Sequence, residues 1–227
     1  RDFCAGHADA VDALLAAGFE VVALFGPEHG IRGDAAAGEE VTGGTDPRTG
    51  LPVFSLYGPT KKPTPEMLAG VDRLVFDMQD VGCRFYTFLS TLSGCLEAAG
   101  EQGIILTVLD RPNPLGGSIV EGPLVKAGFE SFVGYQHTPI RYGLTIGEYA
   151  TWVRDNAGAD CDLSVVTVDG WRRGMSWDET GLPWVMPSPN IPAVDAVRVY
   201  PGTCFIEGTT LSEGRGTSKP FETFGAP

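Results

Sequence analysis

Segments with helical periodicity alternate with short apolar runs along most of the chain. Apolar residues recur at helical spacing from His7 to Ala17, over 85–99 and over 146–156, which predicts three helices. A further helix is expected to open at Thr64-Pro65, because threonine can cap a helix and proline suits its first turn. The apolar runs predict five strands, at 20–25, 52–56, 73–77, 104–109 and 161–168.

The order of these elements predicts an α/β fold. Strands that alternate with helices favour a Rossmann-like three-layer sandwich with a mostly parallel sheet. Long loops at 26–51, 110–145 and 170–192 are expected to be functional, because structureless stretches of that length in a compact domain tend to carry a site. We expect one Rossmann-like catalytic domain over 1–227, truncated at both ends, with irregular, cleft-forming loops in 170–227.

Composition narrows the classes of ligand. The chain has 227 residues and a formal net charge of -13, with 16 Lys and Arg in total, which argues against a nucleic-acid partner. A neutral, amino or sugar-like ligand fits this charge better. No apolar run approaches the roughly 20 residues of a membrane-spanning helix. The chain begins at Arg1 without a signal-peptide pattern, so its compartment is not readable from these residues.

The cysteines indicate neither a zinc site nor a disulfide framework. They are odd in number, widely spaced and free of any CxxC pair, and they stand at Cys4, Cys83, Cys95, Cys161 and Cys204. Most are expected to be buried thiols, and Cys83 is distinguished by its place inside a dense polar motif. We expect no metal and no cofactor.

Polar clusters directly follow three of the predicted strands. Because the ligand crevice of an open parallel sheet lies beyond the carboxyl ends of its strands, we expect these clusters to converge. They contain the candidate site residues Glu28, His29 and Arg32 after the first strand, Asp77, Gln79, Asp80, Arg84 and Tyr86 after the third, and Asp110, Arg111 and Asn113 after the fourth.

Two neighbouring residues of the first cluster are candidates for acid–base chemistry. A partly buried Glu28 could act as a general acid or base, and the alternative is a loop salt bridge to Arg32. His29 could serve as a catalytic or binding residue, or as a hydrogen-bonded structural histidine.

The aspartates and arginines of the other clusters allow several interpretations. Asp77, Asp80 and Asp110 could form a metal cluster, an acid pair or a buried ion network, and the network is the default. Arg84 and Arg111 suit bidentate capture of a ligand carboxylate, because the planar guanidinium matches that group.

Common nucleotide and hydrolase motifs are absent from the sequence, and a late polar segment suits a sugar pocket. No GxGxxG follows the first strand, and neither a P-loop nor a GxSxG elbow is present. Glycines and hydrogen-bonding side chains gather in the late segment, where the candidate pocket residues are Asn190, Glu207, Glu213, Arg215 and Thr217. Glu207 and Glu213 are candidate second carboxyls to pair with Glu28, and either could instead be a partner of Arg215.

Five motifs in order, at 24–33, 76–86, 109–114, 187–190 and 208–217, resemble the exo-β-N-acetylmuramidase NamZ family. The resemblance implies a Rossmann-like catalytic domain followed by a smaller α/β domain, with the cleft at their junction. It also implies the release of N-acetylmuramic acid from the non-reducing ends of peptidoglycan fragments, by a bacterial protein that is exported. The glutamate of the first motif corresponds to Glu28 as the acid/base, and the remaining motif residues are candidate pocket contacts.

The resemblance also sets limits and alternatives. By this resemblance, we expect the chain to lack the family's opening strand and its smaller C-terminal α/β domain. The lactyl carboxylate of muramic acid would give Arg84, Arg111 or Arg215 a binding partner. Two other functions are kept open, a non-catalytic cell-wall sugar-binding module and a carboxylate-cluster metallohydrolase.

Overall fold

The computed structural model describes residues 7–31, 38 and 43–226. Its strands are β1 (Leu24–Gly26), β2 (Gly44–Thr45), β3 (Pro52–Ser55), β4 (Arg73–Phe76), β5 (Ile105–Leu109) and β6 (Asp162–Val166). Its α-helices are α1 (His7–Ala16), α2 (Phe88–Gln102), α3 (Ile146–Asn156) and α4 (Val194–Thr203), and two short 3-10 helices are η1 (Asp178–Thr180) and η2 (Cys204–Gly208).

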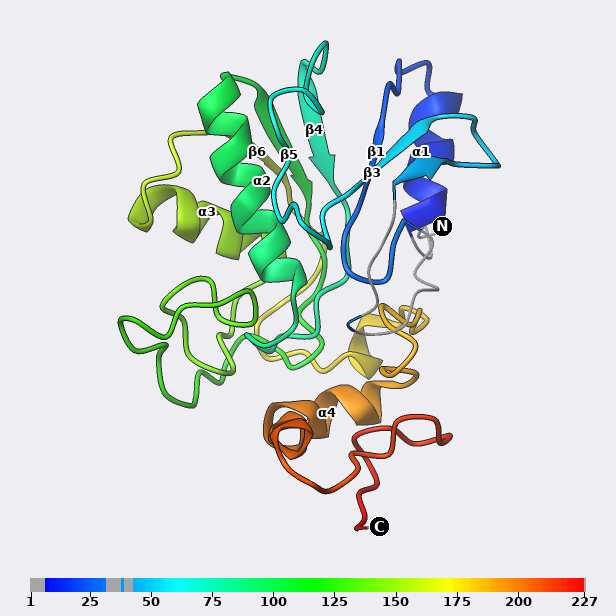
Figure 1. Ribbon diagram of the computed structural model, residues 1–227. Coiled ribbons are helices and arrows are strands. Elements are labelled where there is room, and N and C mark those ends of the chain that lie inside the picture. Colours follow the sequence, from blue (N-terminus) through cyan, green and yellow to red (C-terminus); the bar gives the residue numbers. More distant parts are fainter. Residues whose placement is uncertain (1–6, 32–37, 39–42, 227) are drawn as a thin grey trace.

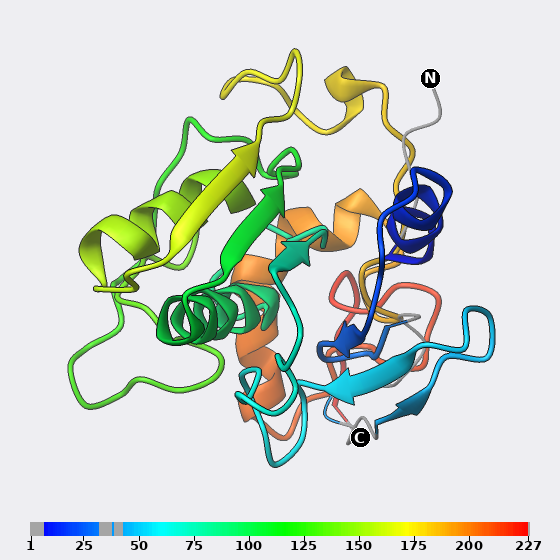
Figure 2. The ribbon, with the colours of Figure 1, turned by 90° about the horizontal axis from the view of Figure 1, so that it is seen from above.

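The strands form two small sheets with mainly parallel pairing. In one sheet β3 pairs in parallel with β1, Leu24 opposite Val53, and pairs antiparallel with β2 on its other side. In the other sheet β4, β5 and β6 are all parallel, with Leu74 opposite Leu106. The two sheets and the flanking helices are visible in Figure 1 and, from above, in Figure 2. The predicted α/β class with a mostly parallel arrangement is confirmed.

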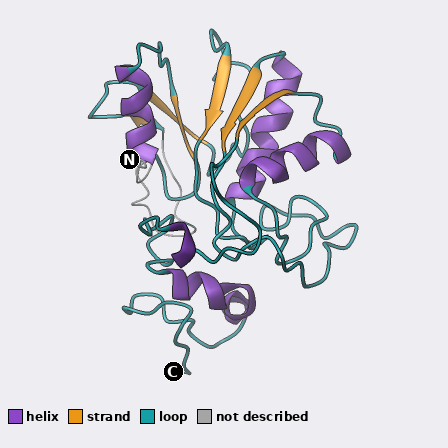
Figure 3. Cartoon of the chain, turned by 180° about the vertical axis from the view of Figure 1, so that it is seen from behind, coloured by secondary structure: helices purple, strands orange, loops and turns teal. Residues whose placement is uncertain are grey.

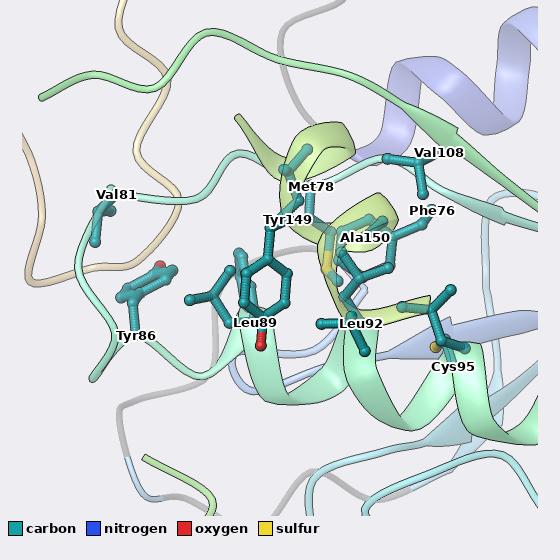
Figure 4. Packing of buried hydrophobic residues seen from close by; sticks show 14 of the residues in the cluster. Phe76, Met78, Val81, Tyr86, Leu89, Leu92, Cys95, Val108, Tyr149 and Ala150 are labelled. Carbon is teal, nitrogen blue, oxygen red and sulfur yellow. The ribbon is translucent and has the colours of Figure 1, made fainter. Parts of the chain in front are cut away.

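The core lies between the β4–β5–β6 sheet and the two helices that pack on it. Leu92 and Leu96 of α2 are completely buried, as is Val108 of β5. Tyr149 and Ala150 of α3 pack into the same cluster, which Figure 4 shows in close view. This burial removes several large apolar side chains from water, each worth roughly 1.5–3 kcal/mol, and so fixes the directions of the strands.

Helix ends follow the expected chemistry. Thr145 forms a capping box with Glu148 at the start of α3, and Gly103 ends α2 in the left-handed region with φ 66°. The helix α3 has the predicted bounds, whereas α2 begins and ends three residues later than predicted over 85–99.

Two sequence-based predictions of helices differ from the structure. The prediction of a helix that opens at Thr64-Pro65 is wrong, because residues 65–70 form turns that end at Gly70, whose φ is 78°. The helix α4 lies in a segment predicted to be irregular because it is rich in glycine and proline. Its β-branched valines and Pro201 also disfavour a helix. Its buried side chains, Val194, Ala196, Val197 and Tyr200, show that tertiary packing outweighs these local preferences.

The long loops gather at the end of the sheets to which β4 points. Figure 3 shows the strands in the upper part of the molecule and most of the irregular chain, together with α4, below them. The residues that follow β1, β3 and β4 therefore meet residues from the last part of the chain. Within the described residues, no helix has the length and apolar character needed to cross a membrane.

Candidate active site

A cavity of about 400 Å³ opens where the strand ends meet the C-terminal segment. Of the residues predicted from the sequence, those that line it are Glu28, His29, Tyr86, Asn190, Glu207, Glu213 and Arg215. Its wall also contains polar and aromatic residues that were not predicted, among them Tyr57, Thr87, Ser188, Tyr200 and Phe221. The polar groups in one concave surface make this cavity the candidate active site.

Glu28 is presented by a tight turn at the end of β1. The amide of Gly30 donates to the carbonyl of Pro27 at 2.9 Å, which places Glu28 and His29 in the two central positions. His29 has φ 74°, a left-handed conformation that non-glycine residues rarely adopt, and it is buried. The backbone strain at His29 therefore accompanies the display of Glu28 toward the cavity, as strain at functional sites often does.

The carboxylate of Glu28 is held by donors from three separate segments. The amide of Gly38 donates to Oε1 at 3.0 Å, and the hydroxyl of Thr87 donates to Oε2 at 2.6 Å. The hydroxyl of Tyr57 also hydrogen-bonds to Glu28. Burial, together with the nearby charge of Glu28 and this hydrogen bond, raises the pKa of Tyr57 from 10.0 to about 12. Tyr57 is therefore a neutral donor at physiological pH.

The opposite wall is built from the C-terminal segment around Arg215. Its Nε lies 2.6 Å from Oε1 of Glu213, and its Nη2 contacts Oε1 of Glu207. The guanidinium also lies over the ring of Phe221, with 5.2 Å between the guanidinium carbon and the ring centroid. Phe221 has φ 63°, so both non-glycine residues with positive φ in the described part of the chain, His29 and Phe221, line this cavity.

Aromatic residues form the floor between these walls. Tyr200 packs edge-on against Phe221 with ring centroids 4.8 Å apart, and Tyr86 packs edge-on against Tyr200 at 6.4 Å. Burial raises the pKa of both tyrosine hydroxyls well above the usual value, so both remain neutral. Aromatic side chains in a wall that also carries polar groups suit a ligand that has apolar faces and hydroxyl groups, such as a sugar ring.

Several other predicted residues lie outside the cavity and shape the strand ends. Asp110 accepts hydrogen bonds from the hydroxyl of Thr145 at 2.8 Å and from the amide of Gly147 at 2.7 Å, so it anchors the start of α3. Arg111 forms an ion pair with Asp77, with Nη2 2.5 Å from Oδ1. These contacts join the ends of β4 and β5 to each other and to α3.

Asp80 and Asn113 belong to a second buried group beside the cavity. Asp80 accepts a hydrogen bond from the amide of Gly82 at 2.7 Å and another from the hydroxyl of Tyr142. Burial raises the pKa of Asp80 from 3.8 to about 7. The side chain of Asn113 donates to the carbonyl of Leu144 at 2.8 Å and packs so closely against Gly82 that no side chain fits there.

The structure does not bring the remaining predicted residues into contact with the cavity. Arg84 donates to the backbone carbonyls of Pro123 and Thr138, and the side-chain amide of Gln79 donates to the carbonyl of Pro112 at 3.1 Å. The hydroxyl of Thr217 closes a local turn by donating to the carbonyl of Gly214 at 2.7 Å. Arg32 lies outside the described residues.

The three aspartates do not meet as a metal site. Asp77 pairs with Arg111, Asp80 contacts Tyr142, and Asp110 anchors α3. Among the residues that the structure describes, no group of three or more His, Cys, Asp or Glu side chains is arranged to hold a metal ion. The arrangement is that of an ion and hydrogen-bond network at the strand ends.

Some of the residues that were not predicted stand next to a recognised motif or a predicted strand. Thr87 immediately follows the motif at 76–86, and Tyr57 lies two residues beyond β3, at the same sheet edge as Glu28. Ser188 lies inside the motif at 187–190. Extending the motif at 76–86 by one residue would have included Thr87, and examining the residue after the strand predicted at 52–56 would have included Tyr57. Tyr200 and Phe221 reach the cavity only through the tertiary fold.

Comparison with known proteins adds family relationships to this geometry. The family model described as exo-beta-N-acetylmuramidase NamZ, N-terminal, matches residues 4–195, and the model described as its C-terminal part matches residues 198–227. The chain is 56% identical over 208 residues to the peptidoglycan beta-N-acetylmuramidase NamZ of Bacillus subtilis (strain 168), which is 92% of this chain and 50% of that protein. The chain thus spans about half the length of this curated relative.

Two solved structures are similar to the whole of the described fold. Both are DUF1343 family proteins from Bacteroides fragilis NCTC 9343. One superposes with a TM-score of 0.84 at 45% identity and covers 94% of this chain and 55% of its own. The other has a TM-score of 0.81 at 36% identity and covers 96% of this chain and 57% of its own.

Proposed function

Because the chain belongs to the exo-β-N-acetylmuramidase NamZ family, we propose that it carries the acid–base centre of a glycoside hydrolase. The substrates are muramyl saccharides derived from peptidoglycan, and the reaction releases N-acetylmuramic acid from their non-reducing ends. The observation that carries this proposal is the carboxylate of Glu28, which lines the cavity and is held by Thr87 and Gly38.

Glu28 acts as the general acid/base in this proposal. A glycosidic oxygen is a poor leaving group until it is protonated, so a carboxyl within hydrogen-bonding reach lowers the barrier to cleavage. The bonds from Thr87 and Gly38 restrict the carboxyl to one orientation, which is the geometric requirement for proton transfer. Water or another group then attacks the anomeric carbon.

The aromatic floor holds the sugar. Tyr200 and Phe221 contribute apolar surface to the cavity wall, and Asn190 and Ser188 contribute polar groups. Such a combination of apolar surface and few polar groups orients a carbohydrate without a large net charge.

The proposal is tested by Glu28→Gln in the full natural chain, with a chromogenic N-acetylmuramide as substrate. We expect kcat to fall by about 10²–10⁴, the range that general acid–base catalysis contributes, with an unchanged unfolding midpoint. Glu97→Gln is the matched control, because Glu97 also accepts a hydrogen bond from a tyrosine, Tyr135 at 2.8 Å, but lies outside the cavity. Turnover by Glu28→Gln close to that of wild type would exclude this role.

We also propose that the protein acts outside the cytoplasmic membrane, where peptidoglycan lies. Muramidase activity in fractionated cells tests this location, and activity confined to the cytoplasmic fraction would contradict it.

A further inference from the structure

Arg215 is the one Lys or Arg side chain among the described residues that line the cavity. The same wall carries Glu28, Glu207 and Glu213, so acidic groups outnumber this cation. A ligand with its own carboxylate would be repelled by such a site unless it could pair with Arg215. The position of Arg215 therefore decides whether an anionic sugar enters.

The two ion pairs of Arg215 are unequal. Glu213, which meets Nε at 2.6 Å, has 12% of its side chain exposed, whereas Glu207, which meets Nη2, has 42% exposed. The buried pair with Glu213 is costly to break, because it would leave a charge away from water. The exposed pair with Glu207 is weak, because solvent screens it and can replace it.

The guanidinium also has the donors and the rigidity that a second carboxylate requires. It carries five N–H groups, and the two pairs with glutamates use Nε and Nη2. Its contact with the ring of Phe221 and the pair with Glu213 hold its plane in place. An incoming carboxylate that replaces Glu207 keeps the same number of charges paired.

The other two arginines that were candidates for binding the carboxylate, Arg84 and Arg111, have partners outside the cavity. Arg84 donates to the carbonyls of Pro123 and Thr138, and Arg111 pairs with Asp77. Neither lines the cavity.

We propose that Arg215 determines specificity by binding the lactyl carboxylate of the muramic acid ring, which replaces Glu207 as its partner. This inference rests on the proposed function. N-acetylglucosamine has no lactyl group, so it leaves Glu207 paired with Arg215 and gains nothing from the guanidinium. An ester of the lactyl group has nearly the same shape as the acid but no charge, and it too loses the interaction.

The experiment measures equilibrium binding of N-acetylmuramic acid and of its lactyl methyl ester to the full natural chain, using calorimetry. Wild-type protein should bind the acid about tenfold to a hundredfold more tightly than the ester, the range expected of charge-assisted hydrogen bonds. Arg215→Lys, which keeps the charge but loses the planar fork, should reduce this ratio about tenfold. Glu207→Gln should strengthen binding of the acid several-fold, since the competing carboxylate is gone, and leave the ester unchanged.

Arg198→Lys provides the matched control. Arg198 is also bracketed by two carboxylates, with Nη2 2.6 Å from Asp178 and Nη1 2.6 Å from Asp195, but it lies outside the cavity. This variant should keep the wild-type ratio of acid to ester affinity.

The outcomes separate this inference from the proposed function. Equal affinities of wild type for acid and ester, or equal losses for both ligands in Arg215→Lys, would overturn the role of Arg215 even if the chain hydrolyses muramides. Carboxylate-dependent binding that Arg215→Lys removes would support that role. If such a protein did not cleave muramides, the proposed function alone would fail.

Discussion

The titration of Asp80 should make the free energy of unfolding depend on pH. This carboxyl is buried, and burial raises its pKa from 3.8 to about 7. Between these values the folded protein keeps a proton that the unfolded chain has released, so the free energy of unfolding falls as the pH rises. The stabilising contribution is complete below about pH 4 and is lost by the time the pH passes about 7.

The magnitude follows from the two pKa values. The difference between 3.8 and about 7 corresponds to about 4 kcal/mol for a single site, a large share of the roughly 5–15 kcal/mol by which domains are stable. Asp80→Asn removes the titration, and its carbonyl can still accept the hydrogen bond from the amide of Gly82. Relative to wild type, the variant should therefore gain up to about 4 kcal/mol between pH 4 and pH 8.

Urea unfolding at a series of pH values measures this change. The quantity of interest is the difference in free energy of unfolding between variant and wild type at each pH, because the titration of all other groups cancels in it. Asp169→Asn is the control, since Asp169 is exposed, and its curve should run parallel to that of wild type. Parallel curves for Asp80→Asn as well would refute the assignment of a raised pKa to this carboxyl.

Two further predictions concern the turn beside Asp80 and the support of Glu28. Gly82→Ala should destabilise the protein by about 2–4 kcal/mol in urea unfolding, because the glycine has φ 75° and the added Cβ would lie 2.3 Å from Oδ1 of Asn113. The control Gly103→Ala, at φ 66° with no atom within 4 Å of the added Cβ, should cost only about 1 kcal/mol. Equal losses of stability in the two variants would refute the steric argument. Thr87→Val should lower kcat on muramides about tenfold, because it removes the 2.6 Å hydrogen bond to Glu28. The control Thr91→Val removes a buried hydroxyl that bonds to the helix backbone, and it should leave kcat unchanged. Full activity of Thr87→Val would show that this bond does not position the carboxyl of Glu28.

Hydrophobic pattern predicted most of the fold because it reports burial directly. The runs that became β4, β5 and β6 pack against α2 and α3, and the 3.6-residue period located these two helices to within a few residues. The segment at Thr64 carries capping residues for a helix, but Gly70 and the start of β4 leave room for turns only. A local signal for helix initiation cannot report how much chain is available before the next strand.

The site was predicted less completely, for a related reason. The sequence located the polar residues at the strand ends, but it could not show which of them form structural hydrogen bonds and which face the cavity. Asp110 anchors α3 and Arg84 ties down backbone carbonyls, while Glu28 alone of the three projects into the cavity. That distinction depends on side-chain direction at each strand end, and the contribution of Tyr200 depends on the packing of α4, which no local pattern indicates.

The cavity wall comes from several separate stretches of the chain, and the division between those before and those after residue 187 matters for how such proteins diversify. Glu28, which would transfer the proton, and Thr87, which positions it, lie before residue 187, whereas Arg215 and Phe221 lie after it. Under the roles proposed above, recombination between relatives at a point before residue 187 would exchange the residues that select the sugar while keeping those that carry out the reaction. Chimeras built at that junction offer a direct route to enzymes with one chemistry and new substrate ranges.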